Sequence, residues 1–299
     1  MTQTRTAFIA IVGCPNVGKS SILNRLLGQK IAVVSPKPQT TRTKIMGVLT
    51  ESDVQLVFTD TPGFHRPRTK LGEKMVKAVS DSISGVDACL FVVEPSGELR
   101  DAERDLLGKF KKEKMPVILA INKIDSVKQK ELLIERMAQF SALYDFEAIV
   151  PCSALKGDGF GELKDELFKQ SQPSPHFFPD DTLTDQPERV IAAEIIREKL
   201  LNLLDDEVPH GVAVCIERMH EREDSDITDI DATVYCERES HKGIIIGKKG
   251  EMLKKVSTRA REDMERFFMC KINLHCWVKV KEGWRNREGL IRNFGLDNE

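Results

Sequence analysis

Residues 13–20, GCPNVGKS, constrain the fold of this 299-residue chain more than any other stretch. They fit the pattern G-x-x-x-x-G-K-[ST]. The apolar run 8–12 before them is typical of a buried strand, and residues 21–27 after them are typical of a helix that ends at Gly28. A loop between a strand and a helix N-terminus presents successive backbone N–H groups to a polyphosphate. The sequence therefore predicts a phosphate-binding loop (the phosphate loop) in an α/β domain.

Each polar residue of the phosphate loop has an expected role. Gly13 and Gly18 let the backbone turn without placing a Cβ toward the phosphates. Lys19 is expected to reach the β- and γ-phosphates, and the Ser20 hydroxyl to bind Mg²⁺. The alternative, a glycine-rich turn that carries a Lys-Ser pair by chance, is disfavoured by the flanking strand and helix.

Residues 122–125, Asn-Lys-Ile-Asp, follow a second apolar run at 116–120. They lie at the carboxyl end of that expected strand, where open parallel sheets bind their ligands. The Asp125 carboxylate can accept hydrogen bonds from N1–H and from the exocyclic amine of guanine. Adenine lacks this pair of donors, and an unpaired carboxylate costs about 1–3 kcal/mol. Asn122 is expected to brace the loop and meet N7, and the stem of Lys123 to cover a face of the ring.

Residues of this kind are also ordinary in surface turns. A guanine-reading role for residues 122–125 therefore depends on their position after a strand and downstream of the phosphate loop.

Two segments between these motifs predict a magnesium shell and a γ-phosphate contact. The apolar run 54–60 ends in Asp-Thr-Pro-Gly at 60–63, where Asp60 can hold Mg²⁺ through water and the Gly63 N–H can meet the γ-phosphate. The polar, proline-broken segment 33–44 offers Thr40 and Thr41 to complete the shell.

A last apolar run, 148–150, leads into Ser-Ala-Leu-Lys-Gly at 153–157, where the Ala154 N–H can read guanine O6. The residues predicted to contact GTP are Gly13, Cys14, Pro15, Asn16, Val17, Gly18, Lys19, Ser20, Ser21, Asp60, Thr61, Pro62, Gly63, Phe64, Asn122, Lys123, Asp125, Ser153, Ala154 and Leu155. The predicted magnesium ligands are Ser20, Thr41 and Asp60. The predicted catalytic residues are Lys19, Asn16, Thr41 and Gly63.

The segments GCPNVGKS, QTTR, DTPG, NKID and SALKG occur here in this order. Together they resemble the GTPase domain of the Era family, within the larger class of phosphate-loop GTPases. In Ras-like GTPases a Gln follows the Asp-x-x-Gly segment and orients water. Here Phe64 stands at that position, so intrinsic hydrolysis is expected to be slow. Asn16 resembles the Asn that helps hold a K⁺ ion in related GTPases.

Composition agrees with a two-domain globular protein, since 40% of the residues are hydrophobic and 31% are charged. The longest apolar runs are strand-sized, below the ~18 residues of a membrane-spanning helix. The N-terminal residues show no signal for export, so we expect a cytoplasmic location. The seven cysteines are odd in number and contain no C-x-x-C pair. Reduced thiols are therefore expected in place of a disulfide framework or a zinc site.

A proline-rich stretch predicts the domain boundary. Residues 169–187 contain four of the 13 prolines, which excludes a helix and disfavours an inner strand. We therefore predict a GTPase domain at 1–170, a linker at 171–187 and a second domain at 188–299. In the first domain, apolar runs alternate with amphipathic helical stretches, which predicts a mostly parallel sheet with 43–50 as an antiparallel strand.

The order of helices and strands expected in the second domain predicts an α+β fold. The expected elements are a helix at 190–204, strands at 212–219 and 227–237, a Gly-Lys-Lys-Gly turn at 247–250 between two helices, a helix at 251–268 and a strand at 271–280. This order resembles the KH module of bacterial RNA-binding proteins, known as type II, whose G-x-x-G loop clamps about four nucleotides. The residues predicted to bind RNA are Gly247, Lys248, Lys249, Gly250, Ile244, Ile246 and Lys254.

Charge distribution supports this interpretation. Residues 241–292 hold eight Lys and six Arg against six acidic residues, although the whole chain has a net charge of −2. A basic end on an acidic body is typical of nucleic-acid binding. The alternative is a solvated basic face on a long helix.

The sequence allows two environments for each of the two tryptophans. Alternation along 271–280 places Ile272 inward and Trp277 on the outer face, where it either stacks on a base or packs beneath a helix. Trp284, with Arg285 and Arg287, either contacts RNA or lies at the surface.

The joined resemblance points to the Era family, and it implies a GTP-hydrolysing switch that binds the 3′ end of small-subunit (16S) ribosomal RNA and assists 30S subunit assembly. It implies GTP or GDP and Mg²⁺ as cofactors, with K⁺ as an option. It implies small-subunit ribosomal RNA and the 30S subunit as partners, a monomer, and peripheral contact with the inner membrane as a further option. The alternatives are a constitutive RNA-binding module that nucleotide only stabilises, and a GTPase that acts on tRNA or another structured RNA.

Overall fold

The computed structural model describes residues 3–37, 40–65, 67, 69–205 and 207–297. Gln39 of the QTTR segment lies outside the described residues. The chain forms two compact units. The first comprises residues 1–32, 41–67 and 75–185, and the second comprises 33–40, 68–74 and 186–299.

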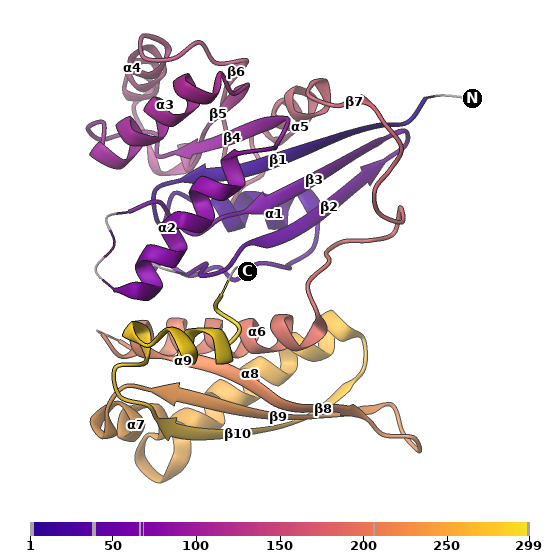
Figure 1. Ribbon diagram of the computed structural model, residues 1–299, viewed down its shortest axis with the longest axis vertical. Coiled ribbons are helices and arrows are strands. Elements are labelled where there is room, and N and C mark those ends of the chain that lie inside the picture. The colour runs from indigo at the N-terminus through magenta and orange to yellow at the C-terminus, as the bar shows by residue number, and fades with distance from the viewer. Residues whose placement is uncertain (1–2, 38–39, 66, 68, 206, 298–299) are drawn as a thin grey trace. The chain divides into compact units, whose positions relative to one another are not determined.

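The first unit is built on a mostly parallel sheet (Figure 1). Its strands are β1 (Arg5–Gly13), β2 (Ile45–Glu51), β3 (Val54–Asp60), β4 (Ala88–Val93), β5 (Val117–Ile121), β6 (Ala148–Pro151) and β7 (Gln172–Pro173). The order is β2-β3-β1-β4-β5-β6, with β7 beside β1. Strand β2 runs antiparallel to β3, whereas β3, β1, β4, β5 and β6 pair in parallel. This confirms the predicted α/β fold.

Helices cover both faces of this sheet, which explains why its central strands are apolar throughout. The helices are α1 (Lys19–Leu27), α2 (Lys70–Ile83), α3 (Asp101–Glu113), α4 (Lys130–Ser141) and α5 (Phe160–Lys169). Alternate residues of β4, such as Phe91, pack with Val79 of α2, Phe110 of α3 and Phe140 of α4. Helices α1 and α5 contact strands of the same sheet, α1 along β1 to β3 and α5 along β3, β5 and β6.

The segment predicted as a linker, 171–187, differs from that prediction over most of its length. Residues 172–184, which we call the strap, are bonded to the first unit. Fully buried Gln55 accepts from the backbone N–H of Phe177 at 2.8 Å and donates to the Phe178 carbonyl at 2.9 Å. The N–H of Val48 donates to the Leu183 carbonyl at 2.9 Å. Because proline has no backbone N–H, the strap cannot form a regular ladder of β-sheet hydrogen bonds. The Gln55 side chain pairs with its backbone groups instead. The longest segment of the second unit begins only after the strap, at residue 186.

The second unit has the predicted α+β order. It contains α6 (Glu188–Leu203), β8 (Ala213–Glu221), β9 (Ile227–Cys236), α7 (Glu239–Ile246), a 3₁₀ turn (Lys248–Gly250), α8 (Glu251–Phe268), β10 (Lys271–Val280) and α9 (Glu288–Asn293). The sheet order is β10-β9-β8, with β10 parallel and β8 antiparallel to β9. Ile272 of β10 is buried in the core with Ile196 of α6 and Met264 of α8, which confirms the predicted inward face of β10.

The two tryptophans occupy opposite environments. Trp284 is fully buried, its Nε1 donates to the Gly211 carbonyl at 2.9 Å, and its ring packs edge-on against Phe294 at 5.4 Å. The expectation of a surface residue or RNA contact is wrong for Trp284, because the C-terminal segment folds back over the sheet. Trp277 is 49% exposed, so its packing beneath a helix is also wrong.

Candidate nucleotide and RNA sites

The phosphate loop joins β1 to α1 and needs glycine at two positions. Gly18 precedes Lys19 with φ 99°, a left-handed conformation that other residues rarely adopt. A Cβ on Gly18 would lie 2.1 Å from Nδ2 of Asn122, and a Cβ on Gly13 would lie 2.3 Å from the Val92 carbonyl oxygen. The close approach of β4 and of residues 122–125 therefore dictates both glycines.

Lys19 is almost fully buried in the phosphate loop. Its Nζ donates to the carbonyl oxygens of Gly13 at 3.2 Å and Cys14 at 3.0 Å. Burial lowers the pKa of the Lys19 ammonium, although the nearby Asp60 carboxylate opposes this. A buried ammonium among neutral carbonyls is suited to an anionic ligand, since a phosphate would compensate the lost hydration.

The three predicted magnesium ligands meet in the structure. The Ser20 hydroxyl donates to Oδ2 of Asp60 at 2.5 Å and lies 2.9 Å from the Thr41 hydroxyl. Asp60 is fully buried, and its Oδ1 has no hydrogen-bond partner among the described residues. Burial raises the pKa of Asp60 to about 6, against the hydrogen bonds of Ser20 and Thr41.

Three convergent oxygens and an unsatisfied buried carboxylate oxygen fit the oxygen preference of Mg²⁺. Ser20, Thr41 and Asp60 are thus the residues that would hold it. Mg²⁺ bound there would neutralise charge on the phosphate oxygens.

The segments predicted to read guanine also come together. Nδ2 of Asn122 donates to the Val17 carbonyl at 2.9 Å, and Oδ1 of Asn122 accepts the Ala154 N–H at 3.0 Å. The Ser153 hydroxyl donates to Oδ1 of Asp125. The bracing predicted for Asn122 is therefore present. This Ala154 N–H is the group that the sequence predicts to read guanine O6. Parallel strands bring these segments together because their carboxyl ends meet at one edge.

The Asp-Thr-Pro-Gly segment lies against the phosphate loop. The Phe64 N–H donates to the Gly13 carbonyl at 3.0 Å, and a Cβ on Gly63 would lie 2.6 Å from Cα of Pro15. The Phe64 ring is 8% exposed and packs in the core, with Nζ of Lys109 4.6 Å from its centroid. The side chain that follows Gly63 thus packs inward and offers water no hydrogen-bonding group.

Sequence reasoning missed Glu94, which lies one residue beyond β4. Its carboxylate accepts from Lys123 at 2.8 Å and also from Arg100. An available signal was the apolar run 88–93, because Glu94 follows it directly, at the same edge of the sheet as Asp60 and residues 122–125.

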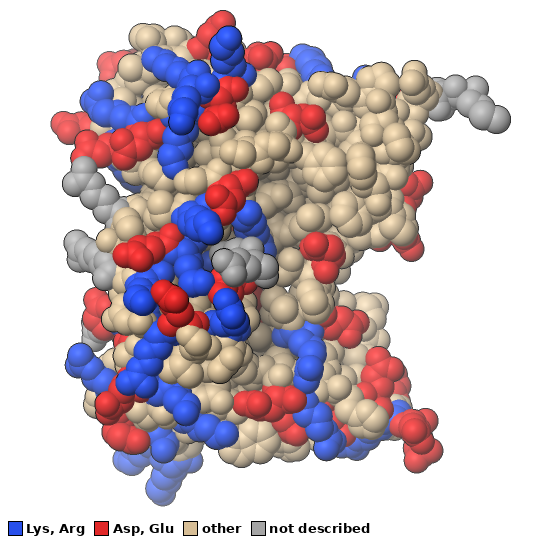
Figure 2. All heavy atoms as spheres, viewed as in Figure 1, with Lys and Arg blue, Asp and Glu red and all other residues tan. Residues whose placement is uncertain are grey.

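The predicted RNA loop has the backbone of a tight glycine turn. Gly247 has φ 74°, and a Cβ there would lie 2.7 Å from Cβ of Met252. Gly250 has φ 81° with open space around it, so its conformation alone favours glycine. Lys248 and Lys249 are exposed between them. Lys and Arg side chains gather near this end of the second unit in Figure 2.

The isoleucines and lysine beside the loop differ in exposure. Ile245 is buried in the core, whereas Ile244 is 50% exposed and Ile246 is half-buried. Lys254 is exposed one turn into α8. The predicted RNA residues therefore include both apolar and basic side chains that are accessible to solvent.

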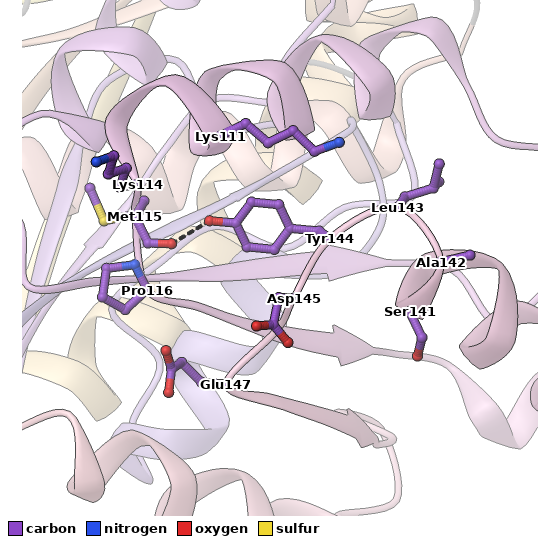
Figure 3. A pocket seen from close by; sticks show the side chains of 10 residues that line it. All are labelled: Lys111, Lys114, Met115, Pro116, Ser141, Ala142, Leu143, Tyr144, Asp145 and Glu147. Atoms are coloured by element: carbon purple, nitrogen blue, oxygen red, sulfur yellow. Dashed lines mark hydrogen bonds between the residues drawn. The ribbon is translucent and has the colours of Figure 1, made fainter.

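The first unit contains a pocket of about 610 Å³ (Figure 3). It is bounded by the end of α3 and by residues 141–147, where the Tyr144 hydroxyl donates to the Met115 carbonyl. Because β5 begins at Val117, this pocket is at the amino ends of the parallel strands. It is thus opposite the edge where the nucleotide segments meet.

Comparison with known proteins decides the family. Residues 8–123 match the family model described as 50S ribosome-binding GTPase, and residues 207–285 match the KH domain. The chain is 48% identical over 295 residues to GTPase Era of Clostridioides difficile strain 630, and the match covers 99% of each chain. The chain belongs to the Era family of GTPases. GTPase Era of Ruminiclostridium cellulolyticum is 49% identical over 291 residues, 97% of each chain.

Two solved Era structures extend this likeness to the fold. A point variant of Era from Aquifex aeolicus bound to GDP·AlF₄⁻ has a TM-score of 0.94 and 37% identity, covering 98% of this chain and 99% of its own. Era in complex with MgGDPNP and nucleotides 1506–1542 of 16S ribosomal RNA has a TM-score of 0.92 and 38% identity, with the same coverage. The resemblance inferred from the motifs and both predicted folds are confirmed.

The described helices include none that is both long enough and apolar enough to span a bilayer.

Proposed function

We propose that this Era-family GTPase is a molecular switch that binds the 3′ end of 16S ribosomal RNA and assists 30S subunit maturation. The observation that carries this proposal is the presence, on one chain, of the converged oxygens of Ser20, Thr41 and Asp60 and of an exposed Gly-Lys-Lys-Gly turn. An Era structure that matches this chain over 98% of its length holds MgGDPNP and a segment of 16S ribosomal RNA. That relative favours a small-subunit target.

In this proposal, GTP or GDP and Mg²⁺ are the cofactors. Lys19 stabilises charge on the phosphates, Thr41 and Gly63 sense the γ-phosphate, and Asp125 accepts from guanine. Asn16 helps to hold K⁺ as a second cation.

Nucleotide-dependent RNA affinity tests the switch. If GTP and RNA favour the same form, each must tighten the binding of the other by the same factor. We expect RNA to bind ~5- to 150-fold more tightly when the protein holds a non-hydrolysable GTP analogue than when it holds GDP. This difference corresponds to a coupling of about 1–3 kcal/mol between nucleotide and RNA. Thr41→Ala should reduce this difference. Equal RNA affinities in the wild type would instead support a constitutive RNA-binding module.

Charge reversal in the turn tests the RNA site separately. Lys248→Asp with Lys249→Asp places like charge against phosphate, so RNA binding should weaken while nucleotide affinity stays unchanged. The slope of log affinity against log salt should flatten by about one unit per lost contact. Lys111→Asp with Lys112→Asp on α3 is the matched control, since both side chains are exposed in the first unit. Equal losses in both double variants would argue against the KH turn as the RNA site.

The choice of RNA separates this proposal from the tRNA alternative. Cross-linking in cells, followed by sequencing of the bound fragments, should recover the 3′ end of 16S ribosomal RNA. Recovery of mainly tRNA would overturn the assignment. We also propose a cytoplasmic monomer. Peripheral membrane contact stays a prediction of the resemblance, and cell fractionation tests it.

A further inference from the structure

Glu94 occupies the carboxyl edge of the sheet, between the base-reading residues 122–125 and the start of α3. Its Oε1 accepts from Nζ of Lys123 at 2.8 Å, and its Oε2 accepts from the Arg100 guanidinium. Burial works against the charged carboxylate, yet hydrogen bonds from Lys123 and Arg100 hold the pKa of Glu94 below its ordinary value. One carboxylate therefore joins two cations on different segments.

The loop that carries Glu94 is held by a buried ion pair. Arg136 of α4 donates to the backbone carbonyls of Glu94 at 3.3 Å and Gly97 at 3.1 Å, and to both carboxylate oxygens of Glu103 at 3.1 Å. The side chains of Arg136 and Glu103 are 3% and 1% exposed. Glu103 also accepts the Arg100 N–H at 2.9 Å. A paired, multiply bonded buried charge fixes backbone geometry, because any displacement leaves a charge unsatisfied.

Two features of Lys123 favour a fixed partner for its side chain. It has φ 65°, a left-handed conformation that is uncommon for Lys. A free Lys side chain also carries about 2 kcal/mol of rotamer entropy. Asn122, the residue before Lys123, is already hydrogen-bonded to the phosphate loop at the Val17 carbonyl. The Glu94 carboxylate supplies a second, ionic tie on the other side of residues 122–125.

We propose that Glu94 is a positioning residue of the guanine site, which orders the Lys123 side chain along the base-reading segment before nucleotide binds. The inference rests on the proposed nucleotide site and deepens it. Glu94 acts through Lys123 and has no contact with nucleotide assigned to it. The rigid Arg136–Glu103 pair sets where its carboxylate lies.

The test compares two variants of the same loop in the full-length protein. Glu94→Gln preserves shape and removes the charge, and Glu98→Gln makes the same change at an exposed position four residues away. Dissociation of fluorescently labelled GDP should be about 3- to 10-fold faster in Glu94→Gln, since a charged hydrogen-bonded pair is weakened. Glu98→Gln should dissociate at the wild-type rate. Equal rates in both variants would overturn the proposal.

A double-mutant cycle separates positioning from general destabilisation. If Glu94 acts through Lys123, adding Glu94→Gln to Lys123→Met should leave the dissociation rate of Lys123→Met nearly unchanged. Additive losses would overturn the positioning role. Glu94→Asp keeps the charge and should recover part of the wild-type rate, and thermal unfolding of each variant without nucleotide shows that the fold is intact.

Failure of the positioning role of Glu94 can be distinguished from failure of the proposed nucleotide site. If wild-type protein failed to bind labelled GDP, the proposed function would fail. If the wild type bound GDP and the two loop variants matched it, only the role of Glu94 would fail.

Discussion

The side-chain amide of Asn122 and the backbone carbonyl of Val17 are joined by a hydrogen bond of 2.9 Å across 105 positions of the chain. The same amide accepts the Ala154 N–H at 3.0 Å. One buried side chain thus connects the phosphate loop, residues 122–125 and the segment after β6. This arrangement requires that the carboxyl ends of β1, β5 and β6 meet at one edge of the sheet.

Asn122→Ala should loosen all three segments at once. It leaves the Val17 carbonyl and the Ala154 N–H without these partners, at about 1–3 kcal/mol for each group that stays buried. We expect weaker GDP binding and a lower melting temperature, measured by calorimetry. Asn202→Ala, at an exposed position of α6, is the control and should change neither. Wild-type GDP affinity in Asn122→Ala would mean that the bond does not organise the site.

Asp125→Asn should change the base that is bound. The substitution replaces an acceptor with a group that can donate, so the site should lose GTP and gain xanthosine triphosphate. Competition between the two nucleotides for wild type and variant measures the exchange. If GTP affinity survives the substitution, Asp125 does not read guanine.

Hydrolysis should be slow in the isolated protein and faster in K⁺ than in Na⁺. Phe64 follows Gly63 with its ring in the core, so water-orienting help from that side chain is absent. Asn16, with φ 64°, is in the phosphate loop at the position expected to hold K⁺. Phosphate release in the two salts measures the effect, and Asn16→Ala should remove the difference. Equal wild-type rates in both salts would contradict the K⁺ assignment.

The stability that the His176 contacts give to the strap should decrease as pH rises. Nδ1 of His176 lies 2.7 Å from Asp180, and its Nε2 lies 3.2 Å from the Asp53 carbonyl, so both ring nitrogens face acceptors. The Asp180 hydrogen bond raises the pKa of His176 above its ordinary value of 6.5. A raised folded-state pKa means that the contribution to stability is complete below the ordinary pKa and is lost as pH rises through the raised one.

Nuclear magnetic resonance titration of the His176 ring should therefore give a pKa above 6.5. The difference in melting temperature between the wild type and His176→Gln should shrink as pH increases through that pKa. His220→Gln, at an exposed position of β8, is the control and should show no such trend. A His176 pKa at or below the ordinary value would refute the charged pairing.

The local motifs could be read without a structure because each carries its own chemistry. Gly13 to Ser20, residues 122–125 and the Gly-Lys-Lys-Gly turn predicted their loops, and the apolar runs between them predicted the strands to within a few residues. Backbone conformation and strand periodicity depend mainly on neighbours in sequence, so these features are visible in a single chain.

The tertiary structure alone decided which distant side chains meet. Proline composition suggested a free linker, yet Gln55 satisfies the backbone of the strap from within β3. Trp284 was expected at the surface or in contact with RNA and is buried, because the folded second unit provides a carbonyl for its Nε1 at Gly211, just before β8. No local pattern marks Glu94 as part of the site, and only the fold brings Lys123 and Arg100 to its carboxylate. Burial and pairing are set by residues far apart in the sequence, and no local pattern contains them.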